Sequence, residues 1–251
     1  MKLTGIITGL VLLSMTGLAH AELITIGTAG YQGDEYNLIW DDDNNSNSVV
    51  WLDYTHDAEL NYSGYVDWAT NLDLEIDLFD GYTLTWIDDT WRLPTTVDDS
   101  VPNAADYVGY DGTLSRGWYN TTSEMGHLFY DELGNIGYYV YDDYPEVQTG
   151  YGLTNTGDFE NLLEVWYWSE TQAEGWIEDN PNSVPAYWHM NMNTGYQGYH
   201  VDFNDPSFNL TYGLAIRSGQ VSTAPVPEPS TMLLFGAGLV GFFGFRKKFK
   251  R

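Results

Sequence analysis

The chain has 251 residues, a formal net charge of −27 and no cysteine, so disulfides, thiolate catalysis and cysteine-ligated metal centres are excluded. Its negative charge argues against nucleic acid as a partner, because nucleic acid is bound by cations that displace the phosphate counterions. Aromatic residues make up 16% of the chain, which indicates a packed globular protein rather than an acidic disordered one.

The charges are segregated along the chain. Of the 36 acidic residues, all except Glu228 lie between the two ends. The basic residues of this middle region are Arg92, Arg116 and Arg217, whereas five of the nine basic residues occupy the last six positions. A body so rich in carboxylates suits divalent cations or solubility outside the cell.

The first 21 residues have the pattern of a signal peptide. Lys2 supplies the positive charge, residues 6–18 supply the apolar stretch, and Ala19 and Ala21 form a small-x-small cleavage site. We therefore expect export, with removal of residues 1–21 by signal peptidase. An uncleaved anchor helix is the alternative, which the short apolar stretch and the cleavage site disfavour.

The next part of the chain predicts a single α+β domain with an antiparallel sheet and about two helices. Apolar, β-branched and aromatic runs predict strands at residues 23–26, 36–40, 49–54, 82–87, 186–192 and 208–216. Aromatic and aliphatic residues at helical spacing predict a helix over residues 62–72. A second helix is expected between Thr121, which has the spacing of a capping box with Glu124, and Gly134, which fits a left-handed C-terminal cap.

The acidic turn expected between the second and third strands partly copies a calcium loop. Asp42, Asn44, Ser46 and Asp53 have the spacing of oxygen ligands in such a loop, although Asn47 replaces the usual glycine. Calcium is therefore the one cofactor that the sequence suggests. The alternative is a solvated turn without an ion.

Aromatic side chains among the late strands are candidates for stacking on sugar rings, because their flat faces suit the apolar faces of sugars. The candidates are Trp176, Trp188, Tyr196 and Tyr199. The alternative is that these side chains fill the core of a tyrosine-rich fold.

No catalytic residue can be singled out from the sequence. Carboxylates are too abundant for one glycosidase pair to stand out, and no G-x-S-x-G motif is present. There is no HExxH motif and no tight histidine cluster, so a catalytic zinc site is not expected. His127 is expected to be a satisfied histidine in the core or on the surface of the second helix.

Two arginines of the acidic body are expected to be structural. A guanidinium can bind carboxylates or carbonyls as a fixed fork, so Arg92 and Arg217 could each tie strands together. Pro94 would set an extended turn after Arg92. Trp91, Trp166 and Trp168 are expected in the core.

Residues 222–251 form a three-part tail. A spacer leads to Pro227, Glu228 and Pro229, an apolar segment over residues 230–245 follows, and a basic cluster ends the chain. In motif, order and position this tail resembles the PEP-CTERM sorting signal. The resemblance implies an exosortase as processing partner, a membrane-anchored precursor, and a mature form at the cell surface or in exopolysaccharide. An ordinary tail anchor is the alternative.

Four motifs follow one another in the body. They are Trp91-Arg92-Leu93-Pro94-Thr95, Ser123-Glu124-Met125-Gly126-His127-Leu128, Tyr167-Trp168-Ser169-Glu170-Thr171 and Ala215-Ile216-Arg217. In this order they resemble the Lcl C-terminal-type domain, a C-type-lectin-like fold of bacterial surface proteins. The resemblance implies one such domain over residues 22–221, with glycan binding as an analogy from the fold. The sugar-binding triplets of calcium-dependent lectins are absent from the sequence.

Together these features predict an exported surface or exopolysaccharide-associated protein with a non-enzymatic, glycan- or matrix-binding body. One alternative is an acidic structural matrix protein without a specific ligand. A second alternative is an extracellular enzyme that acts on glycans. An aromatic groove would favour the binding module, whereas two carboxylates facing each other across a cleft would favour the enzyme.

Overall fold

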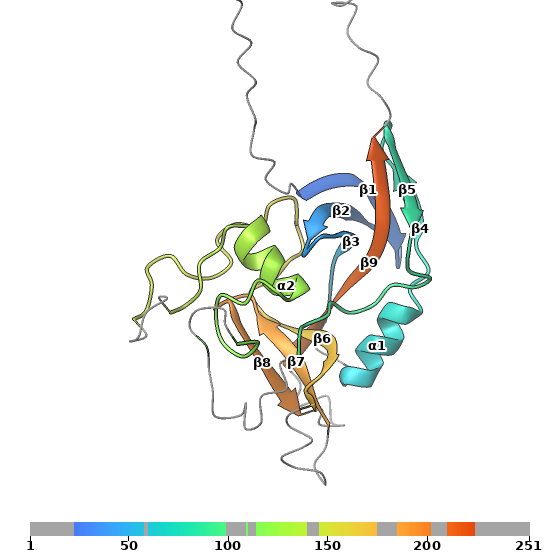
Figure 1. The fold of residues 1–251 in the computed structure, drawn as a ribbon. Coiled ribbons are helices and arrows are strands. Elements are labelled where there is room, and N and C mark those ends of the chain that lie inside the picture. The colour runs from blue at the N-terminus through green and yellow to red at the C-terminus, as the bar shows by residue number, and fades with distance from the viewer. Residues whose placement is uncertain are drawn as a thin grey trace, which may run out of the picture.

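We analysed the fold in a computed structural model, which describes residues 23–57, 60–98, 109, 114–139, 146–174, 185–201 and 210–223. These residues form a mostly β-sheet domain with two short helices (Figure 1). The expected signal peptide lies outside the described residues, as does the sorting tail from residue 224 onward. Among the described residues, no helix is long and apolar enough to span a bilayer.

Nine strands and three helical elements make up the described part of the chain. The strands are β1 (Leu23–Tyr31), β2 (Asp34–Asn44), β3 (Asn47–His56), β4 (Glu75–Leu78), β5 (Tyr82–Trp86), β6 (Trp166–Gln172), β7 (Ala186–Asn191), β8 (Tyr196–Val201) and β9 (Thr211–Thr223). The helical elements are α1 (Tyr62–Thr70), α2 (Glu124–His127) and η1 (Leu128–Glu132), a π-helical turn that continues α2. The strand order is β4-β1-β2-β3-β9-β6-β7-β8, with β5 also paired to β9.

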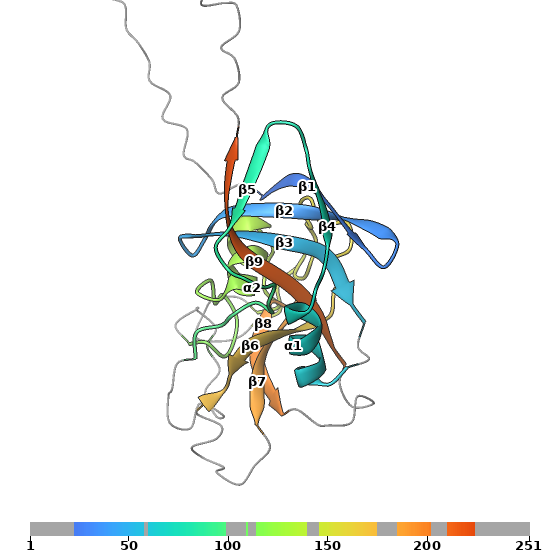
Figure 2. The same cartoon turned by 90° about the vertical axis from the view of Figure 1, so that its right-hand side faces the viewer.

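Strand β9 joins the early and late halves of the sheet. It pairs antiparallel with β3 through residues 213–218 and with β5 through residues 219–223. Its first residues pair parallel with β6, so the sheet is antiparallel except at this one strand pair. Figure 2 shows β9 running from the β1–β3 group down to the β6–β8 group, with α1 beside it. Strand β9 ends at Thr223, two residues beyond the end of the domain expected at residue 221.

The core lies on both faces of the central sheet. Successive side chains of a strand point to opposite faces. Accordingly, Val49 and Trp51 of β3 pack with the side chains of α2 and η1, whereas Val50 and Leu52 pack with β1, β2 and Trp91. All four of these β3 side chains are fully buried. The central strand therefore fixes the helical segment on one face of the sheet.

The turn between β2 and β3 is shorter than the expected acidic turn over residues 41–47. Strand β2 continues to Asn44, and only Asn45 and Ser46 form the turn. Both turn residues have positive φ, at 52° and 67°, as in a two-residue type I′ hairpin whose twist matches the flanking strands. As a result Asp41 lies within a strand instead of in a solvated loop.

The second helix begins later than the capping-box pattern predicts. Its N-cap is Ser123, whose hydroxyl accepts a 3.0 Å hydrogen bond from the Gly126 N–H. Thr121 therefore does not cap the helix, and the Glu124 carboxylate is free to bind elsewhere. The expected left-handed end is present, since Gly134 has a φ of 63°.

Candidate functional sites

The four motifs of the body meet at one hydrogen-bonded junction. The Arg92 guanidinium donates to both carboxylate oxygens of Glu124, each at 2.7 Å. The Thr95 N–H donates to the same carboxylate at 2.6 Å, and the backbone of Arg92 pairs with Ile216 of β9. Because every oxygen of Glu124 has a donor, this junction joins α2 to the sheet as a closed, structural contact.

Pro94 and Thr96 extend the junction to β6. The Pro94 carbonyl accepts a 2.8 Å hydrogen bond from the Glu170 N–H. The Thr171 hydroxyl donates to the Thr96 carbonyl and accepts from the Thr96 N–H, both at 2.9 Å. The segment after Arg92 is thereby held between the helical segment and β6.

Arg217 is the residue of β9 that follows Ile216. Its guanidinium donates to the carbonyls of Asp88 and Asp89 at 2.8–3.0 Å. The same group lies 4.4 Å from the centre of the Trp86 ring, within cation–π range. Arg217 therefore fastens β9 to the loop that follows β5.

The hairpin does not gather the residues expected to bind calcium. Leu52 pairs with Leu38, so Asp53 lies about five residues along β2 from Asp42, or ~17 Å at ~3.4 Å per residue. Asp53 is buried and accepts hydrogen bonds from the backbone N–H groups of Glu160 and Asn161, both at 2.9 Å. The predicted calcium loop is therefore wrong, because a tight hairpin separates its ligands.

Asn44 and Ser46, the remaining residues of that loop, are also placed apart. The buried Asn44 amide donates to Asp41 at 2.8 Å and to the Glu124 carbonyl at 3.2 Å. Ser46 is an exposed residue of the turn. Asn44 thus connects the hairpin to the start of α2.

An aromatic hollow of about 540 Å³ opens where the late strands meet the loops after β5 and η1. Its lining residues come from four separate parts of the chain: Trp118, Tyr138, Tyr139, Trp166, Asn191, Thr194 and Tyr196. The Trp118 ring contacts the rings of Tyr139 at 4.8 Å and Tyr196 at 4.7 Å, each at a steep angle. Of these seven lining residues, all from the described part of the chain, five are aromatic and none is charged.

The described residues among those expected to stack on a ligand lie in different environments. Tyr196 lines the aromatic hollow, and its hydroxyl accepts a 3.0 Å hydrogen bond from Arg116. Trp188 is 1% exposed and donates to Asp98, so it belongs to the core and cannot stack on a ligand. Tyr199 packs its ring against Trp188 and does not line the hollow. Trp176 lies outside the described residues.

The expected core tryptophans are divided between the core and the hollow. Trp91 and Trp168 are buried, at 2% and 0% exposure. Trp166 at the start of β6 is only partly buried and lines the hollow.

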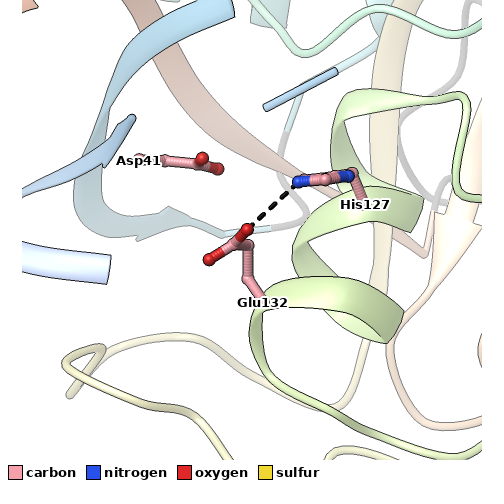
Figure 3. Close-up of side chains that lie close together, drawn as sticks. All are labelled: Asp41, His127 and Glu132. Carbon is pink, nitrogen blue, oxygen red and sulfur yellow. Dashed lines mark hydrogen bonds and ion pairs between the residues drawn. The ribbon is translucent and has the colours of Figure 1, made fainter. Parts of the chain in front are cut away.

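A second site lies at the interface between β2 and the helical segment. Asp41 of β2, His127 of α2 and Glu132 of η1 each place one nitrogen or oxygen atom within 4.8 Å of the others. His127 Nε2 lies 3.1 Å from Glu132 Oε1. Figure 3 shows the three side chains pointing toward one another across the space between strand and helix.

The π-helical turn brings His127 and Glu132 together. In a regular α-helix, residues five apart lie about 140° apart around the axis, at ~100° per residue. The wider turn of η1 carries a Leu133 N–H to Leu128 carbonyl bond of 2.9 Å, five residues apart. This turn rotates the two side chains onto the same side of the helical segment.

Burial leaves this group with unusual electrostatics. Burial raises the pKa of Asp41 to about 6, against hydrogen bonds from Asn44 and Trp51 that lower it. Burial alone would lower the pKa of His127, but its contact with Glu132 and the nearby carboxylates raise it. The imidazole therefore carries a proton more readily than an isolated histidine, which is the response of a base surrounded by carboxylates.

Sequence reasoning missed this group. It treated Asp41 as part of a solvated turn and His127 as an ordinary histidine of a helix. The usable signal was alternation, since Ile39 is a core residue and Asp41 follows it on the same face of the strand. The (i, i+5) contact of His127 and Glu132 carried no signal, because α-helical spacing predicts contacts at i+3 and i+4.

Comparisons with known proteins identify the C-terminal end of the chain. Residues 225–248 match the family model of the PEP-CTERM protein-sorting motif. No curated protein and no solved structure matches the chain, so neither comparison supports the resemblance to the Lcl-type domain.

The matched motif defines the class of the protein. It marks an exosortase-targeted protein that is exported, anchored in the membrane as a precursor and sorted to the cell surface. Pro227, Glu228 and Pro229 of the expected sorting signal lie within the match, although outside the residues that the structure describes.

Proposed function

We propose that the body of this surface protein is a non-enzymatic glycan-binding module and that the aromatic hollow is its binding site. The natural ligand would be an exopolysaccharide at the cell surface. The proposal rests on one observation: in a chain with a formal charge of −27, the described lining of this hollow consists of five aromatic and two uncharged polar residues.

The lining has the chemistry that sugars need. Aromatic faces pack against the apolar C–H faces of pyranose rings, while a few polar groups fix their orientation. Trp166 and Trp118 both contact Tyr196 at steep ring angles, so the rings do not cover one another completely. Asn191 and Thr194 add an amide and a hydroxyl at the edge of the same hollow.

The resemblance of the body to a C-type-lectin-like domain points in the same direction and remains a prediction. Calcium is not part of this proposal, since Asp42 and Asp53 lie far apart on the hairpin. Catalysis is not part of it either, because the described lining of the hollow holds no carboxylate.

The test is a calorimetric titration of the full chain, purified in detergent, with exopolysaccharide isolated from the source cells. We expect saturable binding that a chelator of calcium does not abolish. Trp166→Ala and Tyr138→Ala should each weaken binding by about tenfold, because each removes one wall of the hollow. Trp86→Ala is the matched control, since this partly buried tryptophan lies at the opposite end of β9.

Three outcomes would decide between the alternatives. Equal losses in the Trp166 and Trp86 variants would overturn the assignment of the hollow. No binding by the native chain would leave an acidic matrix protein without a specific ligand as the better account. Shortening of the polymer during incubation, measured by size-exclusion chromatography, would instead indicate a glycan-acting enzyme.

A further inference from the structure

The group of Asp41, His127 and Glu132 offers the donor atoms of a metal site. One imidazole nitrogen and two carboxylate oxygens lie within 4.8 Å of one another. Imidazole together with carboxylate suits zinc and related divalent transition ions, whereas calcium and magnesium prefer oxygen ligands alone. The set therefore fits an ion of the zinc class better than calcium.

Two of the oxygens in this group have no partner. Asp41 Oδ1 and Glu132 Oε2 are both buried, and neither accepts a hydrogen bond from the part of the chain that the structure describes. Asp41 is 0% exposed, and its other oxygen is already held by Asn44 at 2.8 Å and Trp51 at 3.2 Å. Buried carboxylate oxygens without a donor are costly and rare, so each needs a cause. A cation bound between the three side chains would satisfy both oxygens.

The histidine is already oriented as a ligand. His127 Nδ1 lies 3.1 Å from the Asp131 carboxylate, while Nε2 faces Glu132. A histidine that binds a metal commonly donates its other N–H to a carboxylate, which fixes the ring and its tautomer. Asp131 is in place for this role and would leave the Nε2 lone pair directed at Asp41 and Glu132.

We infer that Asp41, His127 and Glu132 bind one divalent transition-metal ion of the zinc class and that Asp131 positions the histidine ligand. Two ionised carboxylates and a neutral imidazole would balance the charge of such an ion. The ion would join β2 to a helical segment some eighty residues later in the chain. In an exported protein with no cysteine, it would take the place that a disulfide occupies elsewhere.

The test uses the full chain in detergent, stripped with a chelator and then titrated with zinc against a competing chromophoric chelator. We expect one tightly bound ion per chain. Zinc at micromolar concentration should raise the midpoint of thermal unfolding by several degrees, whereas calcium and magnesium at the same concentration should raise it much less. Cobalt should report N/O ligation through its visible absorption bands.

Neighbouring carboxylates provide matched variants. Asp41→Asn and Glu132→Gln should weaken zinc binding by tenfold or more, while Asp42→Asn removes the same charge from an exposed side chain and should leave binding unchanged. Asp131→Asn should weaken binding less and change the cobalt spectrum, because it acts through His127. Far-UV circular dichroism shows that each variant is folded.

Either of two results would overturn the inference. One is the absence of zinc binding by the folded native chain up to about a hundred micromolar. The other is an equal loss in Asp42→Asn and Asp41→Asn, which would indicate adventitious binding to the acidic surface. If Asp41→Asn fails to fold, Glu132→Gln decides the question on the same criteria.

Discussion

The helical segment of α2 and η1 carries a buried carboxylate at each end, Glu124 at its start and Glu132 at its end. Both side chains face the sheet and both meet a basic residue. Glu124 receives three hydrogen bonds of 2.6–2.7 Å, two from Arg92 and one from the Thr95 backbone. Glu132 receives one from His127, and its second oxygen has no partner.

This difference separates two uses of a buried charge. At Glu124 the protein supplies every donor, so the contact is closed and has no capacity for a ligand. At Glu132 and Asp41 the protein supplies donors on one side only, and one buried oxygen of each carboxylate has no donor among the described residues, beside a histidine. A closed charge pair holds a fold together, whereas an open one is where an ion can bind. Substitutions at the two kinds of contact should therefore differ in their effect on stability.

Glu124→Ala should produce the largest loss. The substitution leaves the guanidinium of Arg92, which is 22% exposed, without its carboxylate and also removes the acceptor of the Thr95 N–H. We expect the free energy of unfolding to fall by about 3 kcal/mol, at the lower end of the range for breaking a buried ion pair. Urea unfolding at neutral pH in the presence of a chelator measures this loss.

The control for Glu124 is Glu164→Ala, which removes an exposed carboxylate. That variant should change the free energy of unfolding by no more than about 0.5 kcal/mol. A loss of similar size in both variants would mean that the Arg92 contact is not a closed structural pair.

His189 of β7 tests whether an unpartnered buried atom always marks a site for an ion. Its Nδ1 has no partner, and aromatic rings surround it, with Trp166 at 4.2 Å. Burial lowers the pKa of His189 to about 3, with a smaller contribution from His200. The histidine of the unfolded chain titrates near ~6.5. Between these values only the unfolded chain takes up a proton, so stability falls as the pH falls.

We expect protonation of this one histidine in the unfolded chain to lower the free energy of unfolding by about 2 kcal/mol between about pH 6 and pH 4.5. His189→Phe should remove that part of the acid sensitivity, because phenylalanine keeps a ring against Trp166 and cannot be protonated. Urea unfolding at the two pH values measures it. The same pH dependence in the native chain and the variant would contradict the assignment of this acid sensitivity to His189. His200→Gln is the control for the exposed neighbouring histidine.

Arg217→Lys tests a closed contact made to carbonyls instead of a carboxylate. Lysine cannot reach the Asp88 and Asp89 carbonyls as a fork, and it stacks less well on Trp86. Because the contact lies near the surface, we expect a loss of about 1 kcal/mol. The midpoint of urea unfolding measures it, with Arg116→Lys, at another partly buried arginine, as the comparison. A loss as large as that of Glu124→Ala would show that burial does not set the scale of these contacts.

Local pattern predicted much of the sheet. The strands expected at residues 23–26, 36–40, 49–54, 82–87 and 186–192 correspond to β1, β2, β3, β5 and β7, and the helix expected over 62–72 is α1. The sequence pattern does not predict strand β4, because it is a short edge strand whose side chains are mostly exposed. Strand β6 was visible only as the Tyr167-to-Thr171 motif.

The candidate sites were harder to predict because they are built from distant parts of the chain. Of the residues predicted to stack on a ligand, Tyr196 lines the hollow, but Trp118, Tyr138 and Tyr139 come from loops, which have no periodicity. Alternation from Ile39 places Asp41 on the core face of β2, but a hydrophobic pattern gives no reason to extend the strand through a carboxylate. The tertiary packing against η1 shows that this carboxylate is an interior group.

Asp41→Asn should have the smallest effect on the metal-free protein, and this result would separate the two ends of the helical segment most clearly. The asparagine oxygen can still accept from Asn44 and Trp51, while its amide can donate toward Glu132. The substitution also removes a buried charge that the protein does not fully compensate. In chelator we therefore expect the free energy of unfolding to stay within about 0.5 kcal/mol of the native value or to rise. In zinc, only the native chain should gain stability. A loss in chelator as large as that of Glu124→Ala would place Asp41 among the closed structural contacts and leave no reason for an ion there.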